Sequence, residues 1–418
     1  MKILHVIHRF VDTNRRGSEL YTYHLCRALA QRHEVAVFYT SPKGSKRRVE
    51  CGYVDGLKTF VIGSSDSWQE AMLRARSRYA EAAFIEVLTE WRPDIVHFQH
   101  LLFHSLRLPT IAKSVGVRSV FTLHDFWLLC PQIQLLDHEQ RISWPINRRN
   151  CYACCQARTQ RAYSWRRLWG WEPTVVWKKV TLAYYLMRRR PRQVARLMHD
   201  VDLFIAPSRH TRERFVHEGL PPTKVVYCRH GINHDIRPAN YRPRPYTGSL
   251  IDCGFIGSVA THKGIDVLLD AFSRIEDAHL RVYGNAPPQY LNRLPSSRIQ
   301  FMGEITDSEK TEAFRQMHVL IVPSIWLEIG PLVIQEAFLF GVPVITSNIG
   351  GMAELVDDGR NGLLFNVGDA EDLRHKIEYL VRNPEEVERL SANAPAVKSI
   401  HDNAREVEAF YHQVLSPN

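Results

Sequence analysis

Along the whole chain, short apolar runs alternate with longer segments in which apolar residues recur every three or four positions. The short runs predict buried strands, and the periodic segments predict helices with one apolar face. Strands are expected at residues 3–7, 35–39, 95–99, 119–123, 203–206, 225–228, 252–257, 280–283, 299–302, 319–322, 344–346 and 363–365. Helices are expected at residues 19–31, 72–91, 265–273, 308–317, 331–340 and 370–381. This alternation predicts an α/β protein with doubly wound, parallel sheets.

A proline-rich stretch at residues 237–249 interrupts the pattern and predicts a linker. It divides the 418 residues into two Rossmann-like domains, at about 1–240 and 241–400, each long enough to bury a core. The first domain carries an insertion at about 130–200. Ligands bind at the carboxyl ends of the strands in such sheets, so we expect the two domains to face a central cleft.

The positive charge of the chain is concentrated in one segment. Residues 156–200 hold eleven Arg and Lys against Glu172 and Asp200, which accounts for nine of the ten net positive charges. Tryptophans and tyrosines are interspersed there, and such a segment suits an anionic membrane surface. It equally fits a long amphipathic helical insertion with a solvated basic face. A nucleic-acid partner is not expected, because no nucleic-acid-binding motif is present and the rest of the chain is near neutral.

Two observations predict the compartment. The uncharged residues 337–353 are interrupted by glycines and a proline, so they do not predict a membrane-spanning helix. Residues 1–10 predict a strand rather than a signal peptide. We therefore expect a cytoplasmic protein, peripheral on the inner face of the membrane if the basic segment binds lipid. Its eight cysteines are then expected to be thiols.

Four of the cysteines lie within 26 residues: Cys130, Cys151, Cys154 and Cys155. The Cys-x-x-Cys spacing fits two adjacent ligands of a structural zinc or iron ion. Two other interpretations stay open, namely buried thiols without a ligand and a disulfide or redox pair.

The segment 323–365 is the strongest candidate site. A strand ends at Pro323, a loop carries Glu328 and Gly330, and a helix is expected to begin at Pro331. The backbone N–H groups at a helix start bind anions. With Glu336 eight residues after Glu328, two carboxylates are available for sugar hydroxyls, so this segment predicts a nucleotide-sugar site. Taken singly, each glutamate would also fit an ordinary surface position.

These residues resemble the retaining, family-4 type glycosyltransferases (glycosyl transferases group 1), which have the GT-B fold. The hallmark of that family is a pair of glutamates separated by seven residues, followed by Gly-x-Pro-Val, here 341–344, and Gly-Gly-x-x-Glu, here 350–354. The resemblance implies that Glu336 binds the donor ribose. It implies that Glu328 and the loop after it face the donor sugar and phosphates, through Ile329, Gly330, Pro331 and Leu332. A C-terminal helix within 401–418 is implied to pack back on the N-terminal domain.

Two further segments match donor-binding loops of the family. Gly17 and Ser18 follow the first strand, where the family has paired glycines; they also fit an ordinary helix N-terminus with Ser18 near the cap position. Gly257 and Ser258 open a second loop, in which Lys263 is implied to neutralise the leaving diphosphate. The family often has Arg where Ser258 stands, so the usual pair of cations is incomplete here.

His124 and Asp125 follow a strand of the first domain. The family places a histidine at such a strand end near the donor sugar, which implies a catalytic His124, with Asp125 orienting it or contacting the acceptor. The only Asp-x-Asp, Asp200 to Asp202, precedes its strand, which is the wrong end for a ligand site, so no catalytic divalent ion is expected.

Taken together, the sequence predicts transfer of a sugar from a nucleoside-diphosphate sugar to a hydroxyl, with catalytic roles for His124, Lys263 and Glu328. The resemblance implies retention of anomeric configuration and no cofactor required for catalysis. The acceptor is expected to be a glycan or lipid-linked glycan in polysaccharide or glycoconjugate synthesis. A non-catalytic binding or scaffold protein of the same fold and a nucleotide-sugar epimerase are the alternatives.

Overall fold

The structure is a computed structural model. It describes residues 1–45, 48–64, 71, 76–147, 150–155, 157, 184–248, 250–291 and 298–416. The chain forms two compact units. Unit 1 comprises Met1–Arg229 and His401–Asn418, and unit 2 comprises His230–Ile400.

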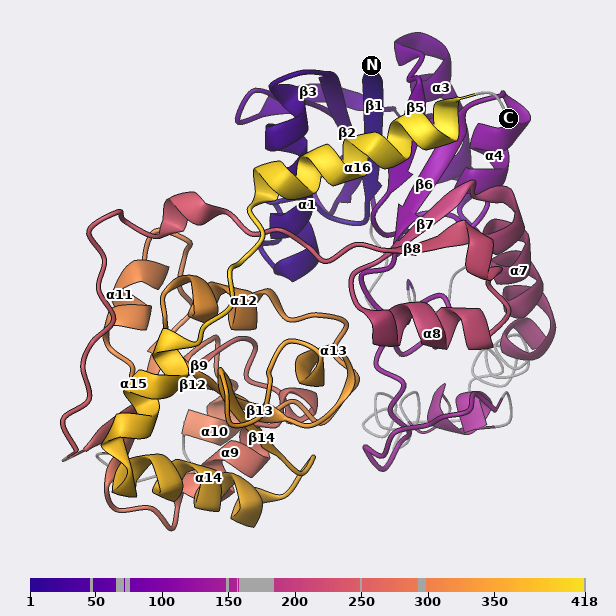
Figure 1. Cartoon of the computed structure of the whole chain (residues 1–418). Coiled ribbons are helices and arrows are strands. Elements are labelled where there is room, and N and C mark those ends of the chain that lie inside the picture. The colour runs from indigo at the N-terminus through magenta and orange to yellow at the C-terminus, as the bar shows by residue number, and fades with distance from the viewer. Residues whose placement is uncertain are drawn as a thin grey trace. The chain divides into compact units, whose positions relative to one another are not determined.

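An eight-stranded sheet with the order β3-β4-β2-β1-β5-β6-β7-β8 forms the centre of unit 1 (Figure 1). Its strands are β1 (Lys2–Ile7), β2 (Glu34–Ser41), β3 (Glu50–Val54), β4 (Leu57–Gly63), β5 (Ile95–Phe98), β6 (Arg118–Thr122), β7 (Leu203–Ala206) and β8 (Val225–Tyr227). All neighbours are parallel except β3 and β4, an antiparallel pair at the edge. Since β1 lies between β2 and β5, the strand order reverses there, and the carboxyl ends of β1 and β5 form the switch point where ligands bind in such sheets.

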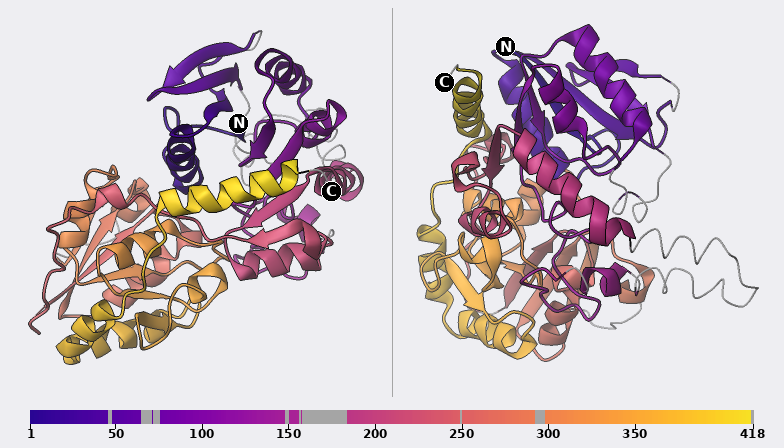
Figure 2. Two further views of the ribbon diagram at one scale, coloured as in Figure 1. Left: turned by 45° about the horizontal axis from the view of Figure 1, so that its top comes forward. Right: turned by 90° about the vertical axis from the view of Figure 1, so that its right-hand side faces the viewer.

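The α-helices of unit 1 are α1 (Gly17–Ala30), α3 (Arg78–Trp91), α4 (Leu108–Ser114), α7 (Arg190–Asp200), α8 (Arg209–His217) and α16 (Ile400–Leu415). A π-helical turn, η2 (Tyr185–Arg189), leads into α7. The last helix, α16, lies alongside elements of unit 1 in both views of Figure 2. The Tyr411 hydroxyl in α16 lies 2.6 Å from Nδ1 of His97 in β5, and Tyr21 of α1 donates to Asn403 at 2.9 Å.

Unit 2 contains a six-stranded, all-parallel sheet with the order β11-β10-β9-β12-β13-β14. Its strands are β9 (Ile251–Ile256), β10 (Ala278–Tyr283), β11 (Ile299–Gly303), β12 (Val319–Val322), β13 (Val344–Ser347) and β14 (Gly362–Phe365). Its α-helices are α9 (Ile265–Phe272), α10 (Pro288–Leu291), α11 (Lys310–Arg315), α12 (Leu332–Leu339), α13 (Gly350–Ala353), α14 (Ala370–Arg382) and α15 (Pro384–Ala392). The order reverses at β9 and β12, which places a second switch point at their carboxyl ends.

Both faces of this sheet are covered, as the apolar runs of its strands require. On one face, β-strand side chains such as Ile321 pack with α9, α14 and α15. On the other, the alternate side chains, such as Leu320 and Val322, pack with α11 and α12. Successive strand residues point to opposite faces, so one short strand contributes to both cores.

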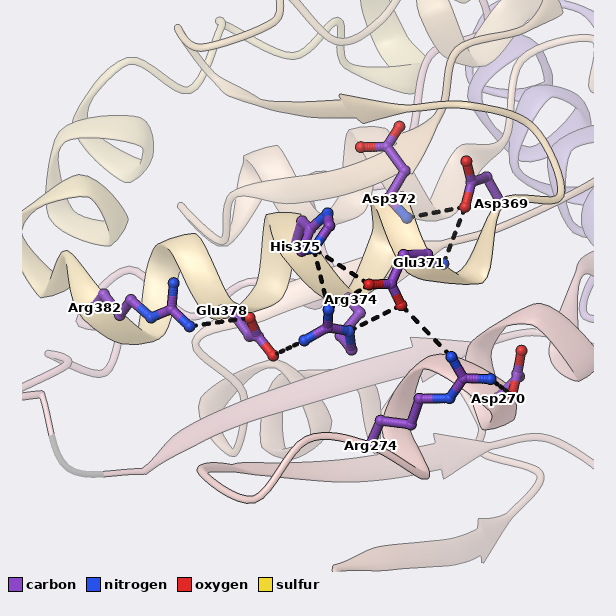
Figure 3. A network of polar contacts seen from close by, with 9 residues as sticks. All are labelled: Asp270, Arg274, Asp369, Glu371, Asp372, Arg374, His375, Glu378 and Arg382. Carbon is purple, nitrogen blue, oxygen red and sulfur yellow. Dashed lines mark hydrogen bonds and ion pairs between the residues drawn. The ribbon is translucent and has the colours of Figure 1, made fainter.

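A charged surface network reinforces the contact between α9 and α14 (Figure 3). Asp369 caps α14 by accepting from the N–H groups of Glu371 and Asp372, both at 3.0 Å. Arg274, just beyond α9, reaches Glu371 at 3.6 Å. These groups are largely solvent-exposed, so each pair contributes at most about 1 kcal/mol.

The structure confirms the predicted α/β class and departs from the predicted elements at several places. Neither β3 nor β4 was predicted; β3 is an edge strand whose side chains are all at least partly exposed, and it has no apolar run. The unit boundary lies before residue 230 rather than at 240, since Ile232 pairs with the 398–400 segment through two backbone hydrogen bonds. Within the predicted insertion, residues 148–149, 156 and 158–183 lie outside the described residues.

Candidate active site

Glu328 lies on the loop that follows β12, and its carboxylate is buried. Its Oε1 accepts three hydrogen bonds, from Lys263 Nζ at 2.6 Å, Ser324 Oγ at 2.8 Å and Trp326 Nε1 at 2.9 Å. The Lys263 ammonium also lies 5.3 Å from the centre of the Trp326 ring, a cation–π distance. The structure therefore brings together Lys263 and Glu328, two of the predicted catalytic residues, and fixes the orientation of the carboxylate.

The loop that carries Lys263 packs tightly against the end of β12 because it contains Gly264. This glycine has φ +75°, and a Cβ there would lie 1.7 Å from the Pro323 carbonyl oxygen. The Ile325 N–H donates to the His262 carbonyl at 3.0 Å, which ties the two loops together. The loop begins at Gly257, and Ser258 is exposed. The predicted donor-binding residues Gly257, Ser258 and Lys263 thus share one loop at the carboxyl end of β9.

The Gly-Gly turn at the start of α13 packs on the Glu328 loop from its other side. The Gly351 N–H donates to the Glu328 carbonyl at 2.8 Å. A Cβ at Gly351 would lie 2.1 Å from the Ile329 carbonyl oxygen, so no larger residue fits. The role of this motif is to let α13 approach the loop that holds the carboxylate.

Glu336 lies on α12 and is buried, with Oε1 2.6 Å from Lys310 Nζ. Lys310 also pairs with Asp307 at 2.8 Å. Burial opposes the charge of Lys310, but the two carboxylates outweigh it and raise the pKa of this lysine. Helix α12 begins at Leu332 and not at Pro331, which is the extended residue before it and supplies no side-chain cap.

Both glutamates share one arrangement. In each, Oε1 is held by a lysine, while Oε2 makes no hydrogen bond with any residue that the structure describes. A carboxylate held this way keeps a charged acceptor for a hydroxyl-bearing ligand. Beside them, the N–H groups at the start of α12 and the Lys263 ammonium are suited to an anion.

In unit 1, helix α1 begins at Gly17 after β1, and the residue in the cap position is Arg16. Ser18 does not cap the helix; its hydroxyl donates to Glu19 at 2.8 Å. Glu19 is buried and lies 3.3 Å from His8 Nε2. Although burial alone would raise it, the contacts with His8 and Ser18 lower the pKa of Glu19 to about 2. A Cβ at Gly17 would meet no atom within 4 Å, so the space beside this helix start is open.

His124 directly follows β6, with Nε2 2.7 Å from Oε1 of Gln99. Gln99 follows β5, and its amide nitrogen lies 3.1 Å from Nδ1 of His5 in β1. His5 is fully buried, and this lowers its pKa to about 3, so it is neutral at physiological pH. Gln99 thus positions His124 through a chain of uncharged side chains.

Asp125 pairs with His100. The backbone N–H of Leu102 donates to His100 Nδ1, so the other nitrogen carries the proton and donates to Asp125 Oδ2 at 3.0 Å. The Trp127 N–H donates to Asp125 Oδ1 at 2.8 Å. These contacts outweigh burial and lower the pKa of Asp125. That Asp125 orients His124 or contacts the acceptor stays a prediction.

The remaining candidates lie elsewhere in unit 1. Asp200 accepts from Thr110 and Arg196, and Asp202 accepts from Arg118, as expected of structural residues. All four clustered cysteines line one small pocket. Among the residues that the structure describes, no group of three or more His, Cys, Asp or Glu is arranged to hold a metal ion as it stands.

Sequence reasoning missed Lys310, His8, Gln99 and His100. The last three follow β1 or β5; a search for polar residues directly after each predicted strand would have found His8 and His100, but not Gln99, which the prediction placed inside the strand 95–99. Lys310 had no comparable signal, because it lies 26 residues from its partner on another helix.

Comparison with known proteins places these features in a family. The model for Glycosyltransferase Family 4 matches residues 15–236, and the model for Glycosyl transferases group 1 matches residues 250–397. An uncharacterized glycosyltransferase of Methanocaldococcus jannaschii is 30% identical over 174 residues, which cover 40% of this chain and 46% of that protein. The phosphatidyl-myo-inositol mannosyltransferase of Mycobacterium leprae is 31% identical over 144 residues, covering 32% of this chain and 38% of that protein. The chain therefore spans about half the length, or less, of these curated relatives.

Among solved structures, the HepE protein of Anabaena in complex with UDP and glucose is similar over 99% of both chains, with a TM-score of 0.65 and 16% identity. This similarity confirms that the two parallel α/β sheets belong to the GT-B fold. Within the described part of the chain, no helix combines the length and apolar character needed to cross a membrane.

Proposed function

This chain belongs to the group 1, family 4 glycosyltransferases, and from that premise we propose that it transfers a sugar from a nucleoside-diphosphate sugar to a hydroxyl acceptor. The observation that carries the proposal is the pair of buried carboxylates in unit 2, Glu328 and Glu336, each held by a lysine through one oxygen. Hydroxyl groups of a sugar and of a ribose are the ligands that such carboxylates accept from.

In this proposal Glu336 Oε2 accepts from the ribose hydroxyls and Glu328 Oε2 from the donor sugar. Lys310 forms an ion pair with Glu336, and this pair offsets the cost of burying the carboxylate. The start of α12, from Ile329 and Gly330 to Pro331 and Leu332, supplies backbone N–H groups to the phosphates. The structural neighbour HepE supports this class of donor, since it was crystallised with UDP-glucose.

Departure of the diphosphate develops negative charge, and Lys263 lies on the Glu328 loop side of this site, 2.6 Å from Glu328 Oε1. An ammonium has three N–H donors, so Lys263 can keep its bond to Glu328 and still donate to a phosphate oxygen. Such preorganised charge is worth several kcal/mol in the transition state. The Gly257 and Ser258 end of this loop, and Gly17 and Ser18 in unit 1, are proposed as further backbone contacts of the donor.

We propose that the acceptor attacks on the face from which the diphosphate leaves, so that anomeric configuration is retained without a protein nucleophile. The positive charge for this step comes from Lys263 and the α12 N–H groups, and no metal ion or cofactor is assigned to it. In this proposal His124, which Gln99 holds, acts on the donor sugar, and Asp125 contacts the acceptor. Exclusion of water would protect the donor from hydrolysis.

The proposed acceptor is a glycan or lipid-linked glycan in polysaccharide or glycoconjugate synthesis. The name of the Mycobacterium leprae relative, a phosphatidyl-myo-inositol mannosyltransferase, supports a lipid-linked acceptor. The basic segment 156–200 supports peripheral binding to an anionic membrane, on the cytoplasmic side. Of its arginines, Arg188, Arg189 and Arg192 are not buried, whereas Arg190 is. Flotation with anionic liposomes tests this: binding should weaken in R188A/R189A/R192A and persist in R360A/R382A/R405A, and equal binding of both would refute it.

The transfer proposal is tested by incubating the full chain with UDP-, GDP- and ADP-sugars and a membrane glycolipid extract. We expect one donor to release its nucleoside diphosphate only when acceptor is present, and the product anomer, read by NMR, to match the donor. His124→Ala should slow release about tenfold, whereas His401→Gln, an exposed control on α16, should not.

Two other outcomes would point to the alternatives. Conversion of the donor sugar without any acceptor would indicate an epimerase. Nucleotide binding with no turnover of any donor would indicate a binding or scaffold protein.

A further inference from the structure

The four clustered cysteines come together from two segments of unit 1. Cys130 ends a turn in which its N–H donates to the Phe126 carbonyl at 2.7 Å. Cys151, Cys154 and Cys155 lie in a helical stretch at residues 150–155. Residues three and four apart share one face of a helix, so these three thiols project from the same side, and all four line one pocket.

These thiols are neutral as they stand. Burial and then the neighbouring thiols raise the pKa of Cys151 to about 12 and that of Cys155 to about 11. Burial likewise raises the pKa of Cys130. Four cysteine sulfurs that line one pocket supply the ligand set of a structural zinc site.

A buried arginine beside the pocket has no carboxylate partner among the described residues. Arg190 follows the π-helical turn and donates to the backbone carbonyls of Leu128, at 2.9 Å, and Trp127. Its guanidinium also lies 5.2 Å from the centre of the Trp127 ring. Burial lowers the pKa of Arg190, and Tyr185 and the thiols of Cys130, Cys151 and Cys155 are near enough to oppose this shift when ionised.

A buried guanidinium stays protonated, and without an opposite charge its burial is costly. Neutral thiols do not provide that charge, and neither would a disulfide. Four thiolates around a divalent cation carry a net charge of −2, and Arg190 would reduce it to −1. A divalent cation bound by the four thiolates would have its sulfur ligands, and the site would then give Arg190 an opposite charge.

We propose that Cys130, Cys151, Cys154 and Cys155 bind one zinc ion as thiolates, with Arg190 as the charge-compensating residue behind them. Four thiol protons leave to solvent as four zinc–sulfur bonds form, and no oxidant is needed. Tetrahedral Zn–S bonds are about 2.3 Å long, so the side chains must rotate toward the middle of the pocket. The ion would fasten the 150–155 helix to the turn after Asp125 and Trp127, next to the unit 1 candidate site, and this role is independent of the transfer reaction.

The test is metal analysis of the full chain purified without a metal-affinity column. We expect about one zinc per chain, lost in Cys154→Ser and retained in Cys51→Ser, whose thiol is exposed and outside the cluster. Less than roughly a tenth of an equivalent of zinc in the unsubstituted chain overturns the proposal. A disulfide between any two of the four cysteines in native mass spectra, or an iron–sulfur absorption spectrum, also overturns it.

Because Cys154→Ser can fail to fold, two further measurements use folded protein. Exchange of zinc for cobalt in the unsubstituted chain should give an intense thiolate-to-cobalt charge-transfer band, and absence of that band contradicts thiolate ligation. Arg190→Met should lose zinc to a chelator at least about tenfold faster than the neighbouring Arg189→Met, whose side chain is exposed. Equal rates would remove Arg190 from the site.

Discussion

The two units hold their candidate site residues with different kinds of interaction. In unit 2, the carboxylates of Glu328 and Glu336 are each bonded to a lysine ammonium. In unit 1, His124 is held by Gln99 and through it by the neutral His5. Burial lowers the pKa of His5 to about 3, so keeping this histidine neutral costs stability as the pH falls. Unit 2 thus holds both of its carboxylates through lysine ion pairs, whereas unit 1 combines a hydrogen bond from His100 to Asp125 with an uncharged chain at His124.

The largest expected effect comes from removing the charge of Glu328, one of the two lysine-paired carboxylates of unit 2. Glu328→Gln removes the charge that orients Lys263 and that would face the donor sugar. Transfer should slow by about 10³-fold, which is about 4 kcal/mol. Steady-state assays of nucleoside diphosphate release measure this, with Glu388→Gln, an exposed glutamate on α15, as the matched control. Similar rates in both variants would remove Glu328 from the chemistry.

The second largest effect is expected from the Lys310–Glu336 ion pair, on the stability of unit 2. Lys310→Met leaves the buried Glu336 carboxylate unpaired and should destabilise unit 2 by about 3 kcal/mol. The double variant Lys310→Met/Glu336→Met has no buried charge left at this position and should be more stable than the single variant. Thermal melting compares them. A single variant as stable as the unsubstituted chain would show that the pair is not needed to bury Glu336.

The histidines of unit 1 predict a smaller, pH-dependent effect. Burial lowers the pKa of His104 to about 3, against 6.5 in the unfolded chain, so the unfolded state binds more protons between those values. Stability from this group is present above pH 6.5 and is lost as the pH falls below it, by about 2 kcal/mol at pH 5. The melting temperature should therefore fall less between pH 7 and pH 5 in His104→Gln than in the exposed control His401→Gln. Equal shifts in both would contradict a neutral, buried His104.

The smallest effect is expected from adding a positive charge to the Lys263 loop of unit 2. Ser258 is exposed on the Lys263 loop, where the family often has Arg. Ser258→Arg should tighten nucleoside diphosphate binding by no more than about fivefold, about 1 kcal/mol, because the added cation is solvated. Titration calorimetry measures the change. A larger gain would mean that this position lies closer to the phosphates than an exposed side chain can.

The unit 2 site was largely predictable because its residues lie in two short segments. The residues from Pro323 to Glu336 and the loop to Gly264 each follow a buried strand, and Gly264 is required because a Cβ there would lie 1.7 Å from the Pro323 carbonyl oxygen. The role of Lys310 was not predictable, since nothing local distinguishes it from a surface lysine. In unit 1 the partners follow different strands, so only the sheet order shows that Gln99 contacts His124.

The account rests on a nucleotide site in unit 2, and titration calorimetry of the full chain with UDP, GDP and ADP tests it most directly. One nucleotide should bind, and Glu336→Gln should weaken that binding at least about tenfold while Glu388→Gln leaves it unchanged. Failure of all three nucleotides to bind, or equal affinity in both variants, would contradict the claim that Glu336 forms part of a donor site.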